Sequence, residues 1–384
     1  MERLPRDLLL RIFAGVDLDD LGRLRCVCRS WHSAIASQEF AQQWKGRDEV
    51  CCVLRAKQKD GFHTEVWYPG SGARRSTGLN PGPRGCFSMG VSSSHGLVCG
   101  LLPEEGRAPG TAWNLVVGNP LTNKWRRLPP IDIPSRPLDT MERIHLQVDP
   151  SKGSYKLVLI YDKYGDDDEV IYHARQYDSE SRVWKSAVPF IGEHDGANTK
   201  IDGAVIGSAG LDYPPYFLMA YNPDSMAWSC HKHFVGEPTF NNGYIYKEYA
   251  NDTAHCGVWR WKDRIFFVTH SCGCVVIWEL DCREGKAKLL SSKRYGELYG
   301  KNWKPREMLL YTSTLLVGST IIVFTELCKS SYGYAPVAYN LKDSTWHSSA
   351  HYNHTSLTTV DIEASCAFIP SFTVEPYGMA RWSC

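Results

Sequence analysis

A short pattern recurs along most of this 384-residue chain, and it constrains the fold more than any other feature. In each copy a small or aromatic residue precedes Asn or Asp, and a tryptophan follows that Asn or Asp six positions later. Asn, Asp, Pro and Ser favour tight turns, so we expect each copy to be a β-hairpin whose tryptophan begins the return strand and packs between sheets. The complete copies span residues 118–125, 177–184, 221–228 and 339–346.

Two degenerate copies extend the series, near residues 67–70 and 278–281, where charged or small residues replace the tryptophan. With them the turn residues are at positions 68, 119, 178, 222, 281 and 340, at intervals that average a little over 50 residues. A period of about 50 residues is typical of kelch-type β-propeller blades. A four-stranded blade cannot cover its own faces, so the six copies predict six blades stacked in a ring, with residues 364–382 helping to close it.

The whole region after Gly46 has the character of an all-β domain. Apolar residues alternate along it, and most of the 21 prolines and 32 glycines fall in predicted turns. The uncharged stretch 308–325 is predicted to form two strands separated at Gly318 and Ser319. Its Thr, Ser and Gly residues interrupt the run of about 18 apolar residues that a membrane-spanning helix needs.

The first 46 residues have helical spacing instead. Apolar residues recur three or four positions apart from Leu4 onward, with Pro5 in a first turn, Gly15 as a stop and Asp17 among the acids that can cap the next helix. About 40 residues hold too few apolar groups to bury both a core and a second face, so exposed leucines call for a partner. The alternative is a helical cap folded back on the rest of this chain.

Residues 4–13 (LPRDLLLRIF) and 20–31 (DLGRLRCVCRSW) resemble the F-box pattern, although residues 15–18 (GVDL) depart from the leucine-proline turn that is commoner in the family. This resemblance implies binding to a Skp-type adaptor and, through it, to a cullin scaffold that carries a ubiquitin-conjugating enzyme. Packing inside the bundle is the alternative for any one residue. The adaptor-binding role carries over onto Leu4, Pro5, Leu8, Ile12, Leu21, Leu24, Val27, Cys28 and Trp31.

Residues 50–375 are similar to the kelch-like, F-box-associated domains abundant in plants, through segments 94–99, 119–130 and 177–179, although the paired glycines of strict kelch blades are absent or eroded. The two resemblances imply a multidomain chain, with an all-α F-box module at 1–46 and an all-β kelch-like propeller at 47–384. They imply the substrate-recognition subunit of an SCF-type ubiquitin ligase complex, joined through a rigid junction at 44–53. The alternatives are an adaptor-bound scaffold that presents no substrate and a small-molecule receptor that uses the propeller channel.

The sequence offers no pattern typical of catalysis or of a bound cofactor. His270, Cys272, Cys274 and Cys282 lack the paired C-x-x-C spacing of a closed zinc site, and residues 166–169 (DDDE) read as a solvated hairpin tip, not a calcium loop. Neither Ser94 with His95 nor His194 with Asp195 has a nucleophile elbow around it. We therefore expect no catalytic residues, no metal and no cofactor. A propeller enzyme would need clustered carboxylates or metal ligands at the channel.

Composition and the first residues bear on partners and compartment. With 43 Lys and Arg against 42 Asp and Glu, the chain has no broad basic field for nucleic acid. The 14 cysteines have irregular spacing, which indicates reduced thiols, and Pro5 and Asp7 interrupt any secretory apolar segment, so we expect the cytoplasm or the nucleus. Aromatic and basic loops are the expected substrate contacts, with packing at strand ends as the alternative. Their candidate residues are Tyr213, Tyr216, His231, His233, Tyr295 and Trp303.

Overall fold

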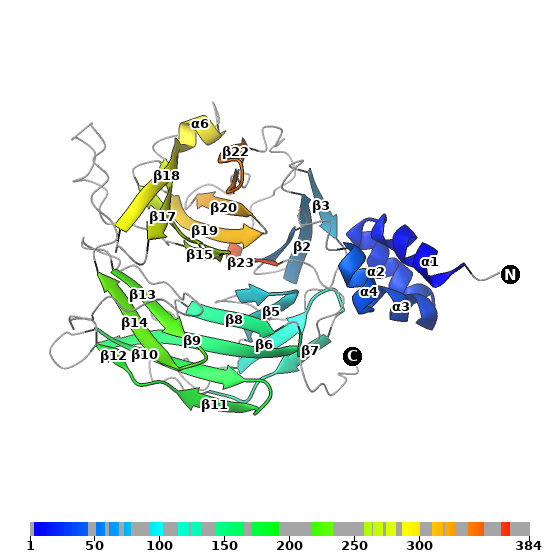
Figure 1. The fold of residues 1–384 in the computed structure, drawn as a ribbon, viewed down its shortest axis with the longest axis horizontal. Helices are drawn as coiled ribbons and strands as arrows, with labels where there is room; N and C mark the ends of the chain where they lie inside the picture. Colours follow the sequence, from blue (N-terminus) through cyan, green and yellow to red (C-terminus); the bar gives the residue numbers. More distant parts are fainter. Residues whose placement is uncertain are drawn as a thin grey trace. The chain divides into compact units, whose positions relative to one another are not determined.

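The computed structural model describes the helices and most strands of the chain (Figure 1). The described residues are 4–44, 51–57, 61–68, 73–77, 92–102, 114–122, 124–131, 143–149, 151–164, 170–191, 217–232, 257–262, 264–271, 274–281, 286–299, 309–317, 319–327, 337–348 and 362–368. The chain divides into two compact units. One comprises residues 1–189 and 361–384, and the other comprises residues 190–360. The expected domain boundary after residue 46 falls outside the described residues, and the helices belong to the same unit as the first β-sheets.

Four short helices form the amino-terminal bundle, as the apolar spacing predicts. They are α1 (Arg6–Ala14), α2 (Leu18–Val27), α3 (Arg29–Ile35) and α4 (Gln38–Trp44). Pro5 precedes α1 and Gly15 ends it, as expected. Asp17 occupies the cap position of α2, but its side chain does not make the capping hydrogen bond that we expected.

Cys28 interrupts the helical spacing that the sequence shows between Leu21 and Ile35. Its backbone is extended (φ −160°, ψ 164°), and its Sγ accepts a 3.5 Å hydrogen bond from the backbone N–H of Trp31, which caps α3. Cys26 and Cys28 are both exposed. The break places Cys28 between α2 and α3, where it begins the next helix.

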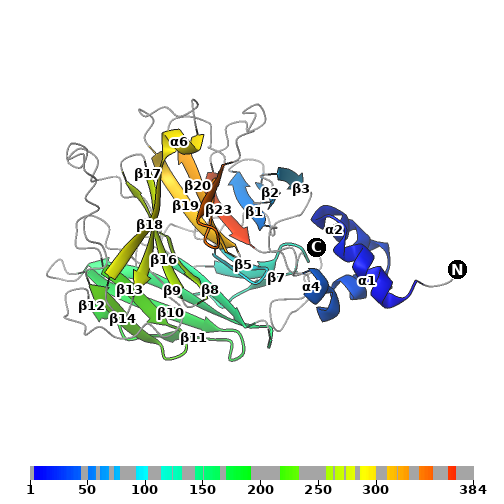
Figure 2. The ribbon, with the colours of Figure 1, turned by 45° about the horizontal axis from the view of Figure 1, so that its top comes forward.

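Three antiparallel sheets follow in the first unit. The first sheet has the order β23-β1-β2-β3, the second β4-β5-β6-β7 and the third β8 to β11 in reverse chain order (Figures 1 and 2). Their strands are β1 (Cys51–Lys57), β2 (Gly61–Tyr68), β3 (Ala73–Thr77), β4 (Ser92–Ser94), β5 (Leu97–Leu102), β6 (Asn114–Asn119), β7 (Lys124–Arg127), β8 (Arg143–Asp149), β9 (Ser154–Tyr164), β10 (Val170–Asp178), β11 (Val183–Ser186) and β23 (Ile362–Phe368).

The second unit contains the fourth, fifth and sixth sheets. They have the orders β13-β14, β15-β16-β17-β18 and β19-β20-β21-β22. Their elements are β13 (Phe217–Asn222), β14 (Ala227–Lys232), β15 (Gly257–Trp261), β16 (Arg264–Ser271), β17 (Cys274–Asp281), β18 (Lys286–Arg294), α6 (Tyr295–Tyr299), β19 (Leu309–Val317), β20 (Thr320–Leu327), β21 (Val337–Asn340) and β22 (Thr345–Ser348), and the short β12 (Phe190–Ile191) begins the unit.

Strands β19 and β20 confirm the two strands predicted within residues 308–325. Strands β9 and β10 pair from Tyr164 and Val170 onward, so they flank the predicted hairpin tip at 166–169, which itself lies outside the described residues. Within the described residues, every helix is too short or too polar to cross a membrane.

The same hairpin occurs in all six sheets, in the same register. The partner residues that flank its loop are Tyr68 and Ala73, Asn119 and Lys124, Asp178 and Val183, Asn222 and Ala227, Asp281 and Lys286, and Asn340 and Thr345. The hairpin prediction is therefore confirmed at the four complete copies and at the two degenerate ones. Each loop holds four residues between its paired strands, which explains the constant offset between the polar residue and the tryptophan.

The turn residue shapes this loop through its side chain. Oδ1 of Asp178 accepts hydrogen bonds from the backbone N–H groups of Glu180 (2.8 Å) and Ser181 (3.2 Å), and Asn222 does the same two and three residues further along. The fourth loop residue then has positive φ, as at Arg182 (60°) and Ser344 (58°). An Asx turn followed by a left-handed residue returns the chain in register, which is why Asn or Asp recurs at this point.

Trp184 and Trp346 pack between sheets, as predicted. Each of these two faces the tyrosine across its hairpin, with ring centroids 5.3 Å apart for Tyr177 and Trp184 and 5.0 Å apart for Tyr339 and Trp346. The indole N–H of Trp184 donates to the carbonyl of Pro129, just after the second sheet, at 3.0 Å. That of Trp346 donates to Oγ of Ser291 in β18 of the fifth sheet at 2.7 Å. The hairpin thus links successive sheets.

Within each unit, an edge strand of one sheet contacts an edge strand of the next sheet. Strand β4 contacts β8 and strand β23 contacts β4, while β15 contacts β19 in the second unit. Strand β23 also pairs with β1, so a strand from residues 362–368 completes the sheet that β1 begins. The described part of the predicted closing segment, 364–368, lies in this strand.

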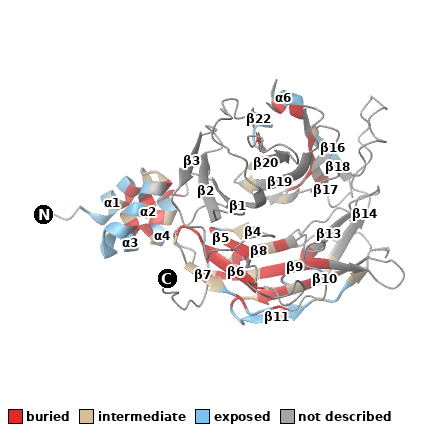
Figure 3. Ribbon diagram, turned by 180° about the vertical axis from the view of Figure 1, so that it is seen from behind, coloured by how far each residue is buried: buried red, intermediate tan, exposed pale blue. Residues whose placement is uncertain are grey.

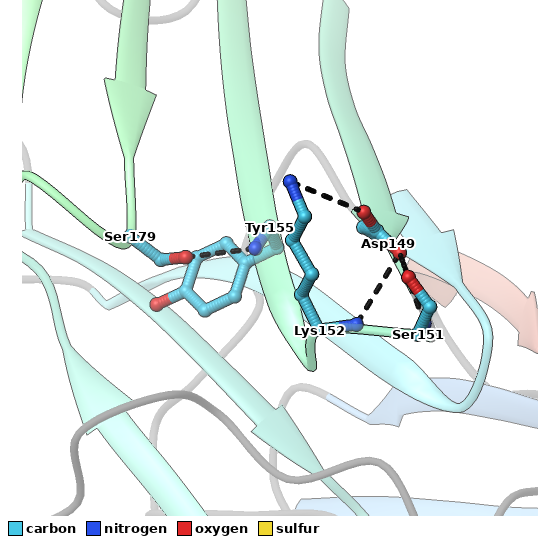
Figure 4. Close-up of polar contacts among 5 residues, drawn as sticks. All are labelled: Asp149, Ser151, Lys152, Tyr155 and Ser179. Carbon is cyan, nitrogen blue, oxygen red and sulfur yellow. Dashed lines mark hydrogen bonds and ion pairs between the residues drawn. The ribbon is translucent and has the colours of Figure 1, made fainter.

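One apolar core of the first unit lies between the second and third sheets. Strands β6 and β9 are mostly buried and β8 buries alternate residues, while β11 at the sheet edge is largely exposed (Figure 3). The loop end of the third sheet is tied by polar contacts (Figure 4). Ser179 accepts a 2.7 Å hydrogen bond from the backbone N–H of Tyr155, and hydrogen bonds from Ser151 hold the pKa of Asp149 below its ordinary value.

Candidate docking surface

Large apolar side chains remain exposed on the outer face of the helices. Leu4, Leu8 and Ile12 are 57%, 42% and 52% exposed, and Val27 at the end of α2 is 60% exposed. Leu8 and Ile12 are four positions apart, so they lie on one face of α1. We call Leu4, Pro5, Leu8, Ile12, Val27 and Cys28, all of them exposed, the docking surface.

The remaining three predicted adaptor contacts are less accessible. Leu21 is fully buried, while Leu24 and Trp31 are half-buried and pack against the bundle core. The ring of Trp31 meets that of Phe13 edge to face, with centroids 5.2 Å apart. Leu21 is therefore part of the bundle core, while Leu24 and Trp31 keep part of their surface available.

The inner face of the helices is buried against the second sheet. Leu10, Phe13, Leu18, Leu21 and Ile35 share one apolar core with four residues of that sheet and its hairpin loop. Those four residues are Val98, Val116, Leu121 and Trp125. The alternative of a helical cap folded back on the chain is therefore confirmed for one face of the helices, while apolar side chains stay exposed on the other face.

Arg25 adds a polar contact to this apolar junction. It is only 8% exposed, and its Nη1 donates a 3.0 Å hydrogen bond to the backbone carbonyl of Leu121, in the loop between β6 and β7. Its Nη2 lies 3.1 Å from Nε2 of His32 in α3. Since a guanidinium only donates, this geometry requires His32 to accept at Nε2. Sequence analysis missed Arg25, because nothing in its local pattern separates it from the exposed arginines nearby.

The helices also carry exposed charges, several of them close in sequence to the exposed apolar residues. Arg6 pairs with Glu39 at 2.8 Å and Arg23 pairs with Asp20 at 3.1 Å, both at the surface. Arg11 and Arg29 are also exposed, in α1 and at the start of α3. An exposed apolar face with charged residues nearby is typical of a protein interaction site.

The candidate substrate contacts are not brought together by the described residues. Tyr295 lies in α6 and is 1% exposed, packed in the core of the fifth and sixth sheets, so for Tyr295 the packing alternative holds and not the substrate contact. The sequence pattern missed the turn of helix that folds its ring inward. His231 lies in β14 opposite Leu218, and Tyr213, Tyr216, His233 and Trp303 lie outside the described residues.

The residues considered for catalysis or metal binding show structural contacts where the structure describes them. Oγ of Ser94 accepts a 3.2 Å hydrogen bond from the backbone N–H of Val148, and this bond links the second and third sheets. The same oxygen lies 3.1 Å from Nδ1 of His95. Among the described residues, no three His, Cys, Asp or Glu side chains gather as metal ligands would. Cys272, Cys282, His194 and Asp195 lie outside that part of the chain.

Residues 1–43 match the family model of the F-box domain, which covers the first three helices and all of α4 except its last residue. No sequence among the curated proteins matches the chain. The family match therefore concerns the helical module, and it places the docking surface within an F-box domain.

Three of the solved structures that match this chain share little sequence with it. A protein from Lactobacillus plantarum is 11% identical over 78% of this chain and 94% of its own, with a TM-score of 0.40. An oligogalacturonate lyase in complex with manganese is 11% identical over 77% of each chain, with a TM-score of 0.36. The β-propeller domain of the Trilobed protease from Pyrococcus furiosus is 13% identical over 80% of this chain and 94% of its own, with a TM-score of 0.35.

Proposed function

We propose that this chain is the substrate-recognition subunit of an SCF-type ubiquitin ligase complex, on the premise that residues 1–43 form an F-box domain. F-box domains bind Skp-type adaptors, and the adaptor joins them to a cullin scaffold. The observation that carries the proposal is the exposed docking surface on helices whose opposite face is already buried against the second sheet. The bundle needs no further packing on the outer face, so exposed leucine and isoleucine there are best accounted for by a partner.

The energetics of such a docking surface rest on a few side chains. Burying one leucine, isoleucine or valine in an interface contributes about 1.5–3 kcal/mol, and a few such residues dominate most interfaces. Leu8 and Ile12 are the strongest candidates. They are exposed on one face of α1, and the opposite face of α1 is packed in the core, which holds the helix in place.

The β region is proposed to be a kelch-like propeller of six blades that holds the target protein. Three observations support this assignment. Six sheets carry the same hairpin in the same register, edge strands of successive sheets contact each other within each unit, and β23 completes the sheet of β1 to β3. Such an arrangement would present loops at its ends for recognition, as propellers do.

In this proposal the chain itself performs no chemistry. It would act by proximity, because holding adaptor and target on one chain raises the effective concentration of target lysines near the ubiquitin-conjugating enzyme. The cytoplasm and the nucleus, where ubiquitin ligases of this type work, are the proposed compartments.

Adaptor binding by the intact chain is the first test. Calorimetric titration with a purified Skp-type adaptor should give saturable binding for the wild-type chain and a loss of at least 100-fold for the double substitution Leu8→Asp and Ile12→Asp. The matched control is Val188→Asp, an equally drastic change at a 79% exposed valine outside the helices, and it should bind like wild type. Circular dichroism verifies that all three proteins are folded. Absence of wild-type binding, or equal binding by all three, would refute the proposal.

The degradative role needs a second measurement. Cells depleted of this protein are complemented with wild type or with the Leu8 and Ile12 variant, and protein half-lives are compared across the proteome. A protein that is destabilised only by wild type identifies a target. If no half-life differs between the two complemented lines, the chain is an adaptor-bound scaffold and the substrate-receptor assignment fails.

A further inference from the structure

Arg25 occupies the junction between the helices and the second sheet, away from the exposed docking surface. Its guanidinium is enclosed there, with 8% of the residue exposed, and it spans from His32 in α3 to the carbonyl of Leu121. A planar guanidinium carries several donors in fixed directions, so it can bridge two acceptors that a lysine ammonium would satisfy less well. Enclosing a charge is costly unless it is hydrogen-bonded, so this contact favours a single docked arrangement.

The acceptor is itself held in place by the hairpin loop. The backbone N–H of Leu121 donates to Oδ1 of Asn119 at 2.9 Å, and the N–H of Thr122 donates to the carbonyl of Asn119 at 3.2 Å. Asn119 is fully buried. The turn residue of this repeat therefore fixes the direction in which the Leu121 carbonyl points, toward α2.

The hairpin that receives Arg25 also differs from its relatives at one position. Where the third, fourth and sixth sheets have a tyrosine opposite the tryptophan, the second sheet has Gly118 opposite Trp125. Trp125 is 5% exposed and belongs to the apolar core that the sheet shares with Phe13 and Leu21. The hairpin is thus adapted to the helices both by its loop carbonyl and by the space that glycine leaves for the indole.

We infer that Arg25 is a positioning residue, which locks the helices onto the hairpin of the second sheet so that the docking surface and that sheet move as one body. The inference rests on the proposed function for its consequence, since a fixed docking surface would fix where an adaptor stands relative to the first unit. It adds a lateral contact between residues far apart in the sequence to the expected rigid junction at residues 44–53, of which 45–50 lie outside the described residues. Arg25 lies outside the docking surface, so its loss should separate orientation from adaptor affinity.

Distances between labels in the full-length chain test the lock directly. Spin labels are attached to unnatural amino acids at Gln42 in α4 and Lys185 in β11, both exposed and both in the first unit, because the exposed Cys26 and Cys28 would take a thiol label. Pulsed EPR should give a narrow distance distribution for wild type and one at least twice as broad for Arg25→Met. The control is Arg23→Met on the same helix, whose side chain is 83% exposed, and it should stay narrow.

A second variant approaches the lock from the sheet. Asn119→Ala removes the side chain that aligns the Leu121 carbonyl and leaves the helices unchanged, so it should broaden the distribution as Arg25→Met does. Adaptor affinity and helical circular dichroism should stay within twofold of wild type for both variants, because a loss of helix structure would lower both. If Arg25→Met unfolds the helices, Asn119→Ala alone decides.

The outcomes separate this inference from the proposed function. Narrow distributions in Asn119→Ala, and in Arg25→Met wherever it is folded, would overturn the lock even if the adaptor binds normally. Absence of adaptor binding by wild type would instead overturn the proposed function, and the distance measurement would still show whether the helices are locked on the sheet.

Discussion

Trp125 lies directly across Gly118 in the β6–β7 hairpin. A β-carbon added at Gly118 would come within 2.3 Å of two indole carbons of Trp125 and within 2.7 Å of the carbonyl oxygen of Lys124. A tyrosine fits at the equivalent position of other hairpins. In the fourth sheet the ring centroids of Tyr221 and Trp228 are 5.1 Å apart. In the second sheet, the indole takes the position nearest the backbone and fills the core beneath the F-box helices.

Gly118→Ala should therefore destabilise the first unit by about 1–3 kcal/mol, the usual cost of forcing an extra carbon into a packed core. The measurement is the free energy of urea unfolding. In a Trp125→Leu background the same glycine substitution should cost less, because the clashing ring is gone and only the contact with the Lys124 carbonyl oxygen remains. Equal costs in both backgrounds would contradict the close contact.

Ser344→Gly should stabilise the hairpin of the sixth sheet. Ser344 is exposed and has a φ of 58°, a left-handed conformation that costs most residues about 1 kcal/mol but not glycine. Part of this gain is offset by the greater freedom of glycine in the unfolded chain, so we expect about 0.5 kcal/mol. Lys342→Gly in the same loop is the control. Lys342 lacks positive φ, and its substitution should lower the thermal midpoint.

Ser291→Ala should weaken the contact between the fifth and sixth sheets. It removes the acceptor of the 2.7 Å hydrogen bond from the indole N–H of Trp346, and losing one such bond costs about 0.5–1.5 kcal/mol. The neighbouring Ser292 is exposed, so Ser292→Ala should change the free energy of unfolding by less than about 0.5 kcal/mol. Equal effects of the two substitutions in urea unfolding would contradict the inter-sheet bond.

The pairing of Glu279 with Arg264 should make the folded protein less stable in acid. The hydrogen bond and charge of Arg264, with Nη2 2.9 Å from Oε2, hold the pKa of Glu279 below its ordinary value of 4.5. A lowered pKa in the folded state contributes stability above the ordinary pKa, and this contribution is lost as pH falls through the folded value. Arg264 is 39% exposed on its side chain, so solvent screening limits the effect to about 0.5–1 kcal/mol.

The comparison for Glu279 is with Glu279→Gln across pH. At pH 7 wild type should be the more stable of the two in urea, and the difference should shrink steadily as the pH is lowered below 4.5. A difference that stays constant between pH 7 and pH 3 would show that the ionised pair does not contribute.

Tyr155 should make stability fall in alkali. Burial raises its pKa well above the ordinary value of 10, and Tyr177 nearby raises it further. The folded state thus favours the neutral hydroxyl. The stability that Tyr155 contributes is therefore complete below pH 10 and is lost as pH rises above that value. Among the described residues the Tyr155 hydroxyl has no hydrogen-bond partner, so Tyr155→Phe should not lower stability at pH 7.

At pH 11 the Tyr155→Phe protein should lose less stability than wild type, because it has no phenol to ionise on unfolding. Tyr172→Phe, at a half-buried tyrosine of β10, is the control and should retain the alkaline loss of wild type. Parallel losses in wild type and Tyr155→Phe would mean that Tyr155 is ionised at the same pH in the folded and unfolded chain.

Much of the fold could be predicted because its signals are local. The polar residue that turns each hairpin and the tryptophan six positions later lie within one loop and two strands, so their pattern survives in the sequence at Asn119, Asp178, Asn222 and Asn340. The helical spacing from Leu4 onward is local in the same way. The candidate docking surface followed from a resemblance in those same residues, and six of the nine predicted contacts are exposed.

What the sequence by itself determined is therefore where the chain turns, which segments are helices or strands, and which module begins it. Only the tertiary structure decided that Leu21 is enclosed while Leu8 is exposed, that Tyr295 packs inward, and that Arg25 reaches Leu121. The physical reason is that turns and periodicity depend on neighbours a few positions away. Burial of a side chain and the partner of an enclosed charge depend on which surfaces, distant in the sequence, pack against each other.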